Sequence, residues 1–337
     1  MDFIHNPISG IQVENFTCFE DLNLQFAGGL NLFIGRNGVG KTHLLKLLYS
    51  VSHALEKYDD LSIEIQEKIM DSFFIEYVDS LCRNNSPFEV CFSMGDSYIK
   101  FDLSSGNDVS AETIGSDPFV ESVIYIPPFE VMTNYRLYSS FESSIKLRLD
   151  STYKYLATAL NANPISNPEL SVVSKIIDDS LKINLLKDNV GFYQVIDDKR
   201  IYASLMSDGI KKILTLKYLI DTDQIKKNTL LFIDEPETHL NPNLINEYVK
   251  VLVQLAVEGV QVFVSSHDYL LTYLLSLHAE YGKLVNVGCK FFSFFKESDC
   301  VKVECGDSLS SLQNNSIFNE YERLIDFENE LFFNEKN

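Results

Sequence analysis

The sequence contains no long uninterrupted apolar run. A membrane-spanning helix needs about 18 consecutive apolar residues, and none of the 337 positions begins such a run. The first ten residues, MDFIHNPISG, also lack the basic region and apolar core of a signal peptide. We therefore expect a cytoplasmic protein that has no membrane partner.

Closely paired cysteines are missing as well. The six cysteines are scattered, and none forms a C-x-x-C pair. Cys300 and Cys305 lie near one another in sequence but have no second ligand pair that would complete a metal site. Reduced thiols are the interpretation favoured over a metal centre.

Positive charge is scarce. Lys and Arg number 28 against 48 Asp and Glu, which gives a formal net charge of −20. Nonspecific nucleic-acid binding rests mainly on neutralising phosphates, so this charge disfavours nucleic acid as a partner. Seven basic residues nevertheless fall in one short region, where a solvated helix surface is favoured over a local basic face. They are Lys199, Arg200, Lys211, Lys212, Lys217, Lys226 and Lys227.

A glycine-rich loop is the first motif with a chemical meaning. NLFIGRNGVGKTHLLKLL, residues 31–48, contains G-x-x-x-x-G-K-T between an apolar strand pattern and a helical one, which is the context of a phosphate-binding loop. Its glycines let backbone N–H groups face a β-phosphate. We expect Lys41 to bind the β- and γ-phosphates and Thr42 to bind Mg²⁺. The predicted nucleotide-binding residues are Gly35, Arg36, Asn37, Gly38, Val39, Gly40, Lys41 and Thr42.

Two further apolar strands end in polar residues. LLFIDEPETHLNP places Asp234 and Glu235 directly after the first strand. Asp234 is expected to hold Mg²⁺, and Glu235 to polarise the attacking water. VFVSSHD ends the second strand before His267, which can hydrogen-bond the γ-phosphate and sense its loss.

The segment LMSDGIKKILTL predicts a helix that begins near Ser207 and Gly209. A serine hydroxyl and free N–H groups at a helix start can bind an anion. An ordinary helix N-cap made by Ser207 or Asp208 is the alternative.

The order of these motifs resembles the ATP-binding-cassette superfamily, over residues 11–50 and about 200–270. That resemblance implies ATP and Mg²⁺ as cofactors. It also implies a homodimer or higher oligomer, in which Ser207 and Gly209 of one protomer close over ATP bound by the other.

DEPETHLNP and LMSDG are similar to the RecF-like and OLD-type branch, which includes DNA repair proteins and bacterial anti-phage ATPases. Two features depart from that branch. No glutamine follows the strand in YIPPFE, where one usually completes the Mg²⁺ shell, and no acidic nuclease cluster follows His267. The D-T-D run at 221–223 reads as a turn. The resemblance therefore implies an ATPase without its own nuclease.

The expected fold is an α/β ABC-type P-loop NTPase core with an N-terminal antiparallel β subdomain. Residues 1–337 form one domain in this interpretation, with a helical subdomain inserted at about 129–187. The expected function is an ATPase that senses, regulates or scaffolds a separately encoded nuclease or toxin in anti-phage defence. A RecF-like DNA repair ATPase and a catalytically slow scaffold remain alternatives.

Overall fold

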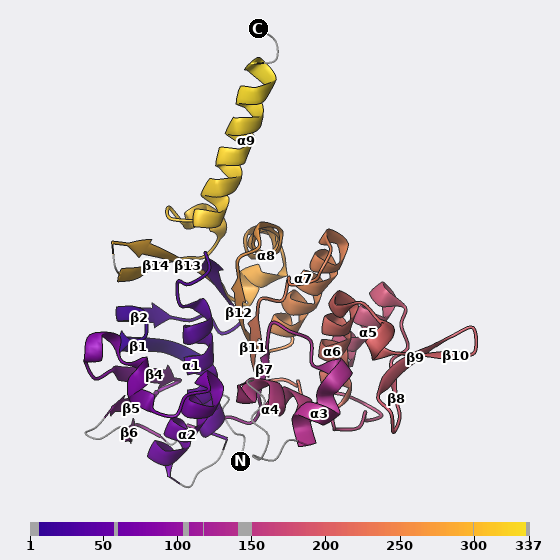
Figure 1. Ribbon diagram of the computed structural model, residues 1–337, viewed down its shortest axis with the longest axis horizontal. Coiled ribbons are helices and arrows are strands. Elements are labelled where there is room, and N and C mark those ends of the chain that lie inside the picture. The colour runs from indigo at the N-terminus through magenta and orange to yellow at the C-terminus, as the bar shows by residue number, and fades with distance from the viewer. Residues whose placement is uncertain are drawn as a thin grey trace.

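The computed structural model describes residues 7–56, 60–103, 108–116, 118–140, 150–298 and 300–334. Its core is a six-stranded sheet in the order β14-β13-β3-β12-β11-β7 (Figure 1). The strands are β3 (Leu30–Gly35), β7 (Val123–Ile126), β11 (Leu230–Asp234), β12 (Gln261–Ser266), β13 (Cys289–Glu297) and β14 (Cys300–Gly306).

The register of this sheet brings the predicted site together. β13, β3, β12, β11 and β7 run parallel, while β14 runs antiparallel to β13. Asp234 pairs with Ser265, and Ser266 pairs with Ile34. The loop after β3, the acids at the end of β11 and the histidine after β12 therefore leave the sheet at one edge.

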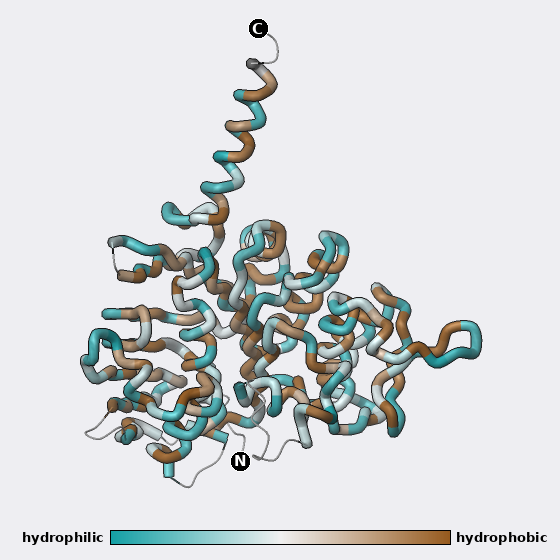
Figure 2. The backbone as a smooth tube through the Cα atoms, viewed as in Figure 1, coloured by the Kyte–Doolittle hydropathy of each residue, from teal (hydrophilic) through white to brown (hydrophobic). Residues whose placement is uncertain are grey.

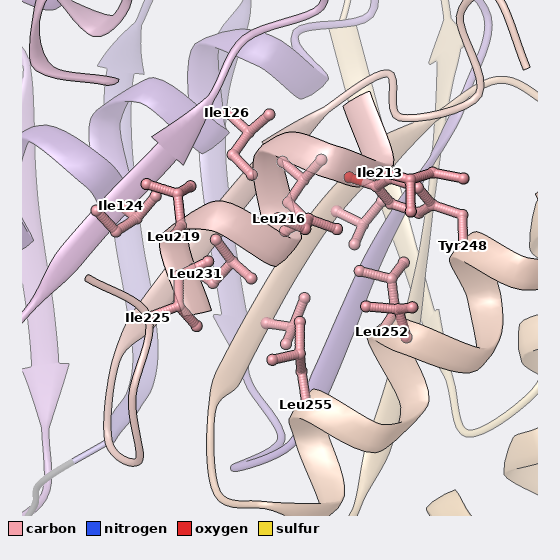
Figure 3. Close-up of a cluster of buried hydrophobic side chains, with 14 of the residues drawn as sticks. Ile124, Ile126, Ile213, Leu216, Leu219, Ile225, Leu231, Tyr248, Leu252 and Leu255 are labelled. Atoms are coloured by element: carbon pink, nitrogen blue, oxygen red, sulfur yellow. The ribbon is translucent and has the colours of Figure 1, made fainter. Parts of the chain in front are cut away.

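Helices cover both faces of the sheet, so the central strands β3, β11 and β12 are buried at every position and mostly apolar. Alternate β3 residues enter different cores: Phe33 joins the core of α1 (Lys41–Ala54), and Leu32 joins that of α6 (Asp208–Asp221) and α7 (Pro242–Val257). Figure 3 shows Leu216 of α6, Leu252 of α7 and Leu231 of β11 as members of this second core.

Five strands between residues 8 and 114 form an antiparallel sheet in the order β2-β1-β4-β5-β6. Its strands are β1 (Ile8–Phe16), β2 (Phe19–Gln25), β4 (Glu89–Met94), β5 (Ser97–Leu103) and β6 (Val109–Ile114). α2 (Leu61–Phe73) packs against α1 and β6. The predicted β subdomain is confirmed, and β4 and β5 form a hairpin around Gly95.

The segment predicted as a helical insertion carries α3 (Tyr135–Ser140), α4 (Ser151–Ala159) and α5 (Ser171–Leu181); residues 141–149 lie outside the described part. β8 (Leu186–Lys187), β9 (Phe192–Ile196) and β10 (Lys199–Tyr202) follow as a small sheet. Figure 1 shows α3, α5 and this sheet on one side of the molecule, beside α6. The boundaries of the inserted helical subdomain, at about 129–187, remain a proposal.

The prediction that the lysines of α6 lie on a solvated helix surface is wrong. Lys211, Lys212 and Lys217 are only 3–8% exposed, because α6 lies between the sheet and the preceding helices. Lys217 Nζ forms an ion pair with Asp221 at 2.7 Å. Asp221 ends α6 and Asp223 has a positive φ of 53°, so the D-T-D run forms a turn as predicted.

α8 (Tyr269–Tyr281) covers the second core, and α9 (Ser316–Asn334) follows β14. Figure 1 shows α9 extending away from the body, and Figure 2 shows hydrophobic and hydrophilic residues alternating along it. Among the described residues, no helix is long and apolar enough to cross a membrane.

Candidate nucleotide site

The glycine-rich loop curls between β3 and α1. Gly35, Gly38 and Gly40 have φ values of 155°, 76° and 88°, in the region that favours glycine. Gly40 is the N-cap of α1, and a Cβ there would lie 2.3 Å from Cys18 Sγ. The loop is therefore closed against the turn between β1 and β2, and its N–H groups lie at the start of a 14-residue helix, a position that attracts anions.

Lys41 lies inside this curl. Its Nζ donates to the carbonyl oxygens of Gly35 at 2.7 Å and Arg36 at 3.0 Å. Burial lowers the pKa of Lys41, and the carboxylates of Glu235 and Asp234 oppose that shift. A cation in this position is placed to meet phosphate oxygens held by the loop.

Asp234 is surrounded by hydroxyl groups. Thr42 Oγ1 donates to its Oδ1 at 3.1 Å, Ser265 donates to the same oxygen, and the Tyr125 hydroxyl donates to Oδ2 at 3.2 Å. Burial raises the pKa of Asp234, and these hydrogen bonds oppose the rise. Carboxylate and hydroxyl oxygens suit Mg²⁺, so Thr42 and Asp234 fit the metal role predicted for them.

Glu235 lies next to His267. The backbone of Glu235 is left-handed, with φ of 47°, and its N–H donates to the Ser265 carbonyl oxygen at 3.0 Å. His267 Nδ1 lies 3.3 Å from Glu235 Oε1 and 3.6 Å from Glu237 Oε1. The Glu235 side chain is 28% exposed and that of His267 42%, so both can reach a ligand in the loop.

Glu237 is a functional candidate to which the sequence analysis assigned no role. It appeared there only within DEPETHLNP, the motif similar to the RecF-like and OLD-type branch. It is buried, and its Oε1 accepts from Ser266 Oγ at 2.8 Å and from the His267 N–H at 3.0 Å. Burial raises its pKa. Glu237 therefore holds the end of β12 and orients His267. The signal was present as the second glutamate of DEPE.

The predicted signature lies at the start of α6. Ser207 is the N-cap but its side chain makes no capping hydrogen bond, and the residue is exposed. Gly209 is buried, and a Cβ there would lie 2.5 Å from the His239 carbonyl oxygen. In the described part of the chain, no hydrogen bond or ion pair joins Ser207 to the glycine-rich loop.

Two links that the sequence did not predict connect this helix to the site. Lys212 Nζ donates to the Glu235 carbonyl oxygen at 3.0 Å, and burial lowers the pKa of Lys212 to about 8. After β7, where no glutamine was found, Glu130 forms an ion pair with Lys211 at 2.8 Å. The loop after β7 is therefore tied to α6 through a carboxylate.

Family comparisons agree with this geometry. Residues 7–112 match a family described as "AAA ATPase domain". Residues 105–272 match one described as "AAA domain, putative AbiEii toxin, Type IV TA system". The chain thus carries AAA-family ATPase domains from the glycine-rich loop through His267.

Curated relatives match locally. The chain is 47% identical over 48 residues to the Old nuclease of Escherichia phage P2, covering 14% of this chain and 8% of that protein. It is 45% identical over 47 residues to RecF of Bacillus cytotoxicus, covering 14% of this chain and 13% of that protein. Over 98 residues it is 32% identical to RecF of Tropheryma whipplei, covering 26% and 27%. The chain therefore spans a small part of the length of these relatives.

Solved structures share the fold over most of the chain. An Smc head bound to the C-terminal winged-helix domain of ScpA gives a TM-score of 0.56 at 13% identity, covering 90% of this chain and 98% of that one. The Smc head domain of Thermotoga maritima gives 0.51 at 12% identity, covering 88% and 98%. The predicted ABC-type fold is confirmed.

Proposed function

We propose that this chain binds ATP and Mg²⁺ and hydrolyses ATP. One observation carries the proposal: Lys41, Thr42, Asp234, Glu235 and His267 come from three separate strand ends and meet at one edge of the sheet. Separated motifs that converge in this way are the arrangement that phosphoryl transfer to water requires.

The residues divide the chemistry between them. Lys41 and the loop N–H groups bind the phosphates, and Thr42 with Asp234 would hold Mg²⁺, which supplies positive charge at the phosphate oxygens. Glu235 accepts the proton of the water that attacks the γ-phosphorus, and ADP leaves. His267 contacts the γ-phosphate, and Glu237 holds its ring.

The active form in this proposal is a homodimer. The exposed Ser207 hydroxyl makes no capping hydrogen bond in the described structure, and no hydrogen bond joins it to the loop there. A second copy would place its Ser207 and the N-terminus of α6 over the γ-phosphate, so two ATP molecules would lie between two protomers.

The biological role we propose is anti-phage defence, with a separately encoded nuclease or toxin as effector. The local similarity to a phage nuclease named Old and to a family described by a toxin supports this role. A RecF-like repair ATPase is the second candidate, supported by the two RecF matches. DNA-stimulated hydrolysis with a steep salt dependence would favour the repair role.

The test of hydrolysis is Glu235→Gln, with the surface substitution Glu67→Gln as the matched control. The amide keeps the shape of the side chain but cannot accept the proton, so we expect the ATPase rate to fall roughly 10²–10⁴-fold. ATP binding should persist, and an ATP-bound dimer should accumulate in size-exclusion chromatography with light scattering. Unchanged hydrolysis in Glu235→Gln would overturn the role of Glu235.

A further inference from the structure

α9 presents a broad apolar stripe that its own chain leaves exposed. Phe318, Tyr321, Leu324, Ile325 and Leu331 recur at helical spacing and are 39–57% exposed. A helix of 19 residues is about 28 Å long. Exposed apolar surface of this extent marks an interaction site.

The base of α9 lies at the nucleotide site. Tyr321 stacks on Tyr269, two residues beyond His267, with ring centroids 4.3 Å apart. Glu320 Oε2 lies 4.0 Å from Nη2 of Arg36, which belongs to the glycine-rich loop. The first turns of α9 therefore border the surface on which ATP and a second protomer would meet.

A second exposed apolar surface lies beside the signature. Leu205, two residues before Ser207, is 74% exposed, and Phe129 is 63% exposed. Phe129 lies shortly before the segment Met132–Asn134, and Leu205 is the last residue of the segment Ala203–Leu205. These two segments contact one another. The chain thus has one apolar surface beside its loop and another beside its signature.

We infer that the apolar stripe of α9 docks on the signature-side surface of a second copy of this chain in the ATP-bound dimer. The inference rests on the proposed function, because a sandwich that places Ser207 over the partner's glycine-rich loop brings Leu205 to the base of the partner's α9. Twofold symmetry makes the contact twice.

Charge favours the body of a second protomer over two other partners for α9, namely another α9 helix and an anionic lipid surface. α9 carries five acidic residues and one arginine between 316 and 334. Two α9 helices packed together would set like charges side by side, and an anionic lipid surface would repel the helix. The body of a second protomer presents the apolar surface without requiring either contact.

A crosslinking experiment tests the contact. p-Benzoylphenylalanine is placed at Leu324 in the Glu235→Gln chain, and ¹⁵N-labelled and unlabelled copies are mixed with ATP or ADP. We expect ATP-dependent crosslinks between copies that map to the segment containing Leu205. Three results would overturn the α9 contact if the ATP-dependent dimer still forms: no crosslinks, crosslinks to the partner's α9, or crosslinks within one chain. Each would leave the proposed dimer itself in place.

Leu324→Asp and Asn319→Asp give a matched pair, since each adds one acid to an exposed position but on opposite faces of α9. Sedimentation velocity of Glu235→Gln with ATP should show a dimer dissociation constant raised roughly tenfold by Leu324→Asp, and almost unchanged by Asn319→Asp. Equal effects of the pair would refute docking. Absence of any ATP-dependent dimer in the Glu235→Gln parent would refute the proposed dimer together with this contact.

Discussion

At the scale of residues, the site contains buried polar groups that hydrogen-bond one another. Asp234 is buried and keeps its position because three hydroxyl groups donate to it. Glu237 is also buried, and its Oε1 receives two hydrogen bonds from Ser266 and His267, while its Oε2 has no hydrogen-bond partner among the described residues. Such groups would be costly if they were left unpaired, so their partners also fix the geometry of the catalytic edge.

Tyr125→Phe tests this arrangement. The Tyr125 hydroxyl donates to Asp234 and lowers the pKa of that carboxyl, which burial raises. Without the donor the pKa of Asp234 rises further, so Asp234 loses its charge at a higher pH. We expect the acid limb of the pH profile of kcat/KM to move to higher pH, and the Mg²⁺ concentration for half-maximal rate to rise roughly 10-fold.

Tyr49→Phe is the control for that experiment. Tyr49 is buried, with its ring centroid 5.1 Å from that of Tyr125, and no hydrogen bond from it to Asp234 is present in the described structure. Removal of the Tyr49 hydroxyl should therefore leave the acid limb of the pH profile and the Mg²⁺ concentration for half-maximal rate unchanged. Identical shifts in the two variants would mean that packing, and not the hydrogen bond, is responsible.

At the scale of elements, the start of α6 is held close to the loop that follows β11. Gly209→Ala would bring a Cβ to 2.5 Å from the His239 carbonyl oxygen. Since backbone cannot yield as a flexible side chain does, we expect a loss of about 1–3 kcal/mol in the free energy of unfolding. Gly191→Ala is the control, because a Cβ there meets nothing within 4 Å. Urea denaturation measures both, and equal stability of the two variants would contradict the close packing.

Contiguous patterns made much of the element order predictable. The glycine-rich loop, the acid pair and His267 each follow an apolar strand directly, and the sheet register joins them as expected. Tyr125 was not predictable, because its partner Asp234 is 109 positions away and tyrosine in an apolar strand carries no signal of its own. The burial of Lys211 and Lys212 was missed for a similar reason, since it depends on how distant helices cover α6.

At the scale of the whole molecule, two copies complete each other's sites in the proposed dimer. Ser207 is exposed at one end of α6, and among the residues that the structure describes no hydrogen bond or ion pair joins it to the glycine-rich loop of its own chain. The fold is shared with Smc heads, at 12–13% sequence identity.

Mixing two inactive variants tests that claim most directly. Ser207→Arg should bind ATP through Lys41 yet fail to hydrolyse it, because the added cation and bulk block closure over the partner's γ-phosphate. Lys41→Ala should lose ATP binding, since it removes the cation at the β- and γ-phosphates. Their heterodimer has one site with both lesions and one site with neither. We expect ATPase activity to return on mixing, to about half of the wild-type rate per heterodimer, because one of the two sites is intact. Heterodimers that form, as shown by native mass spectrometry, but remain inactive would contradict it.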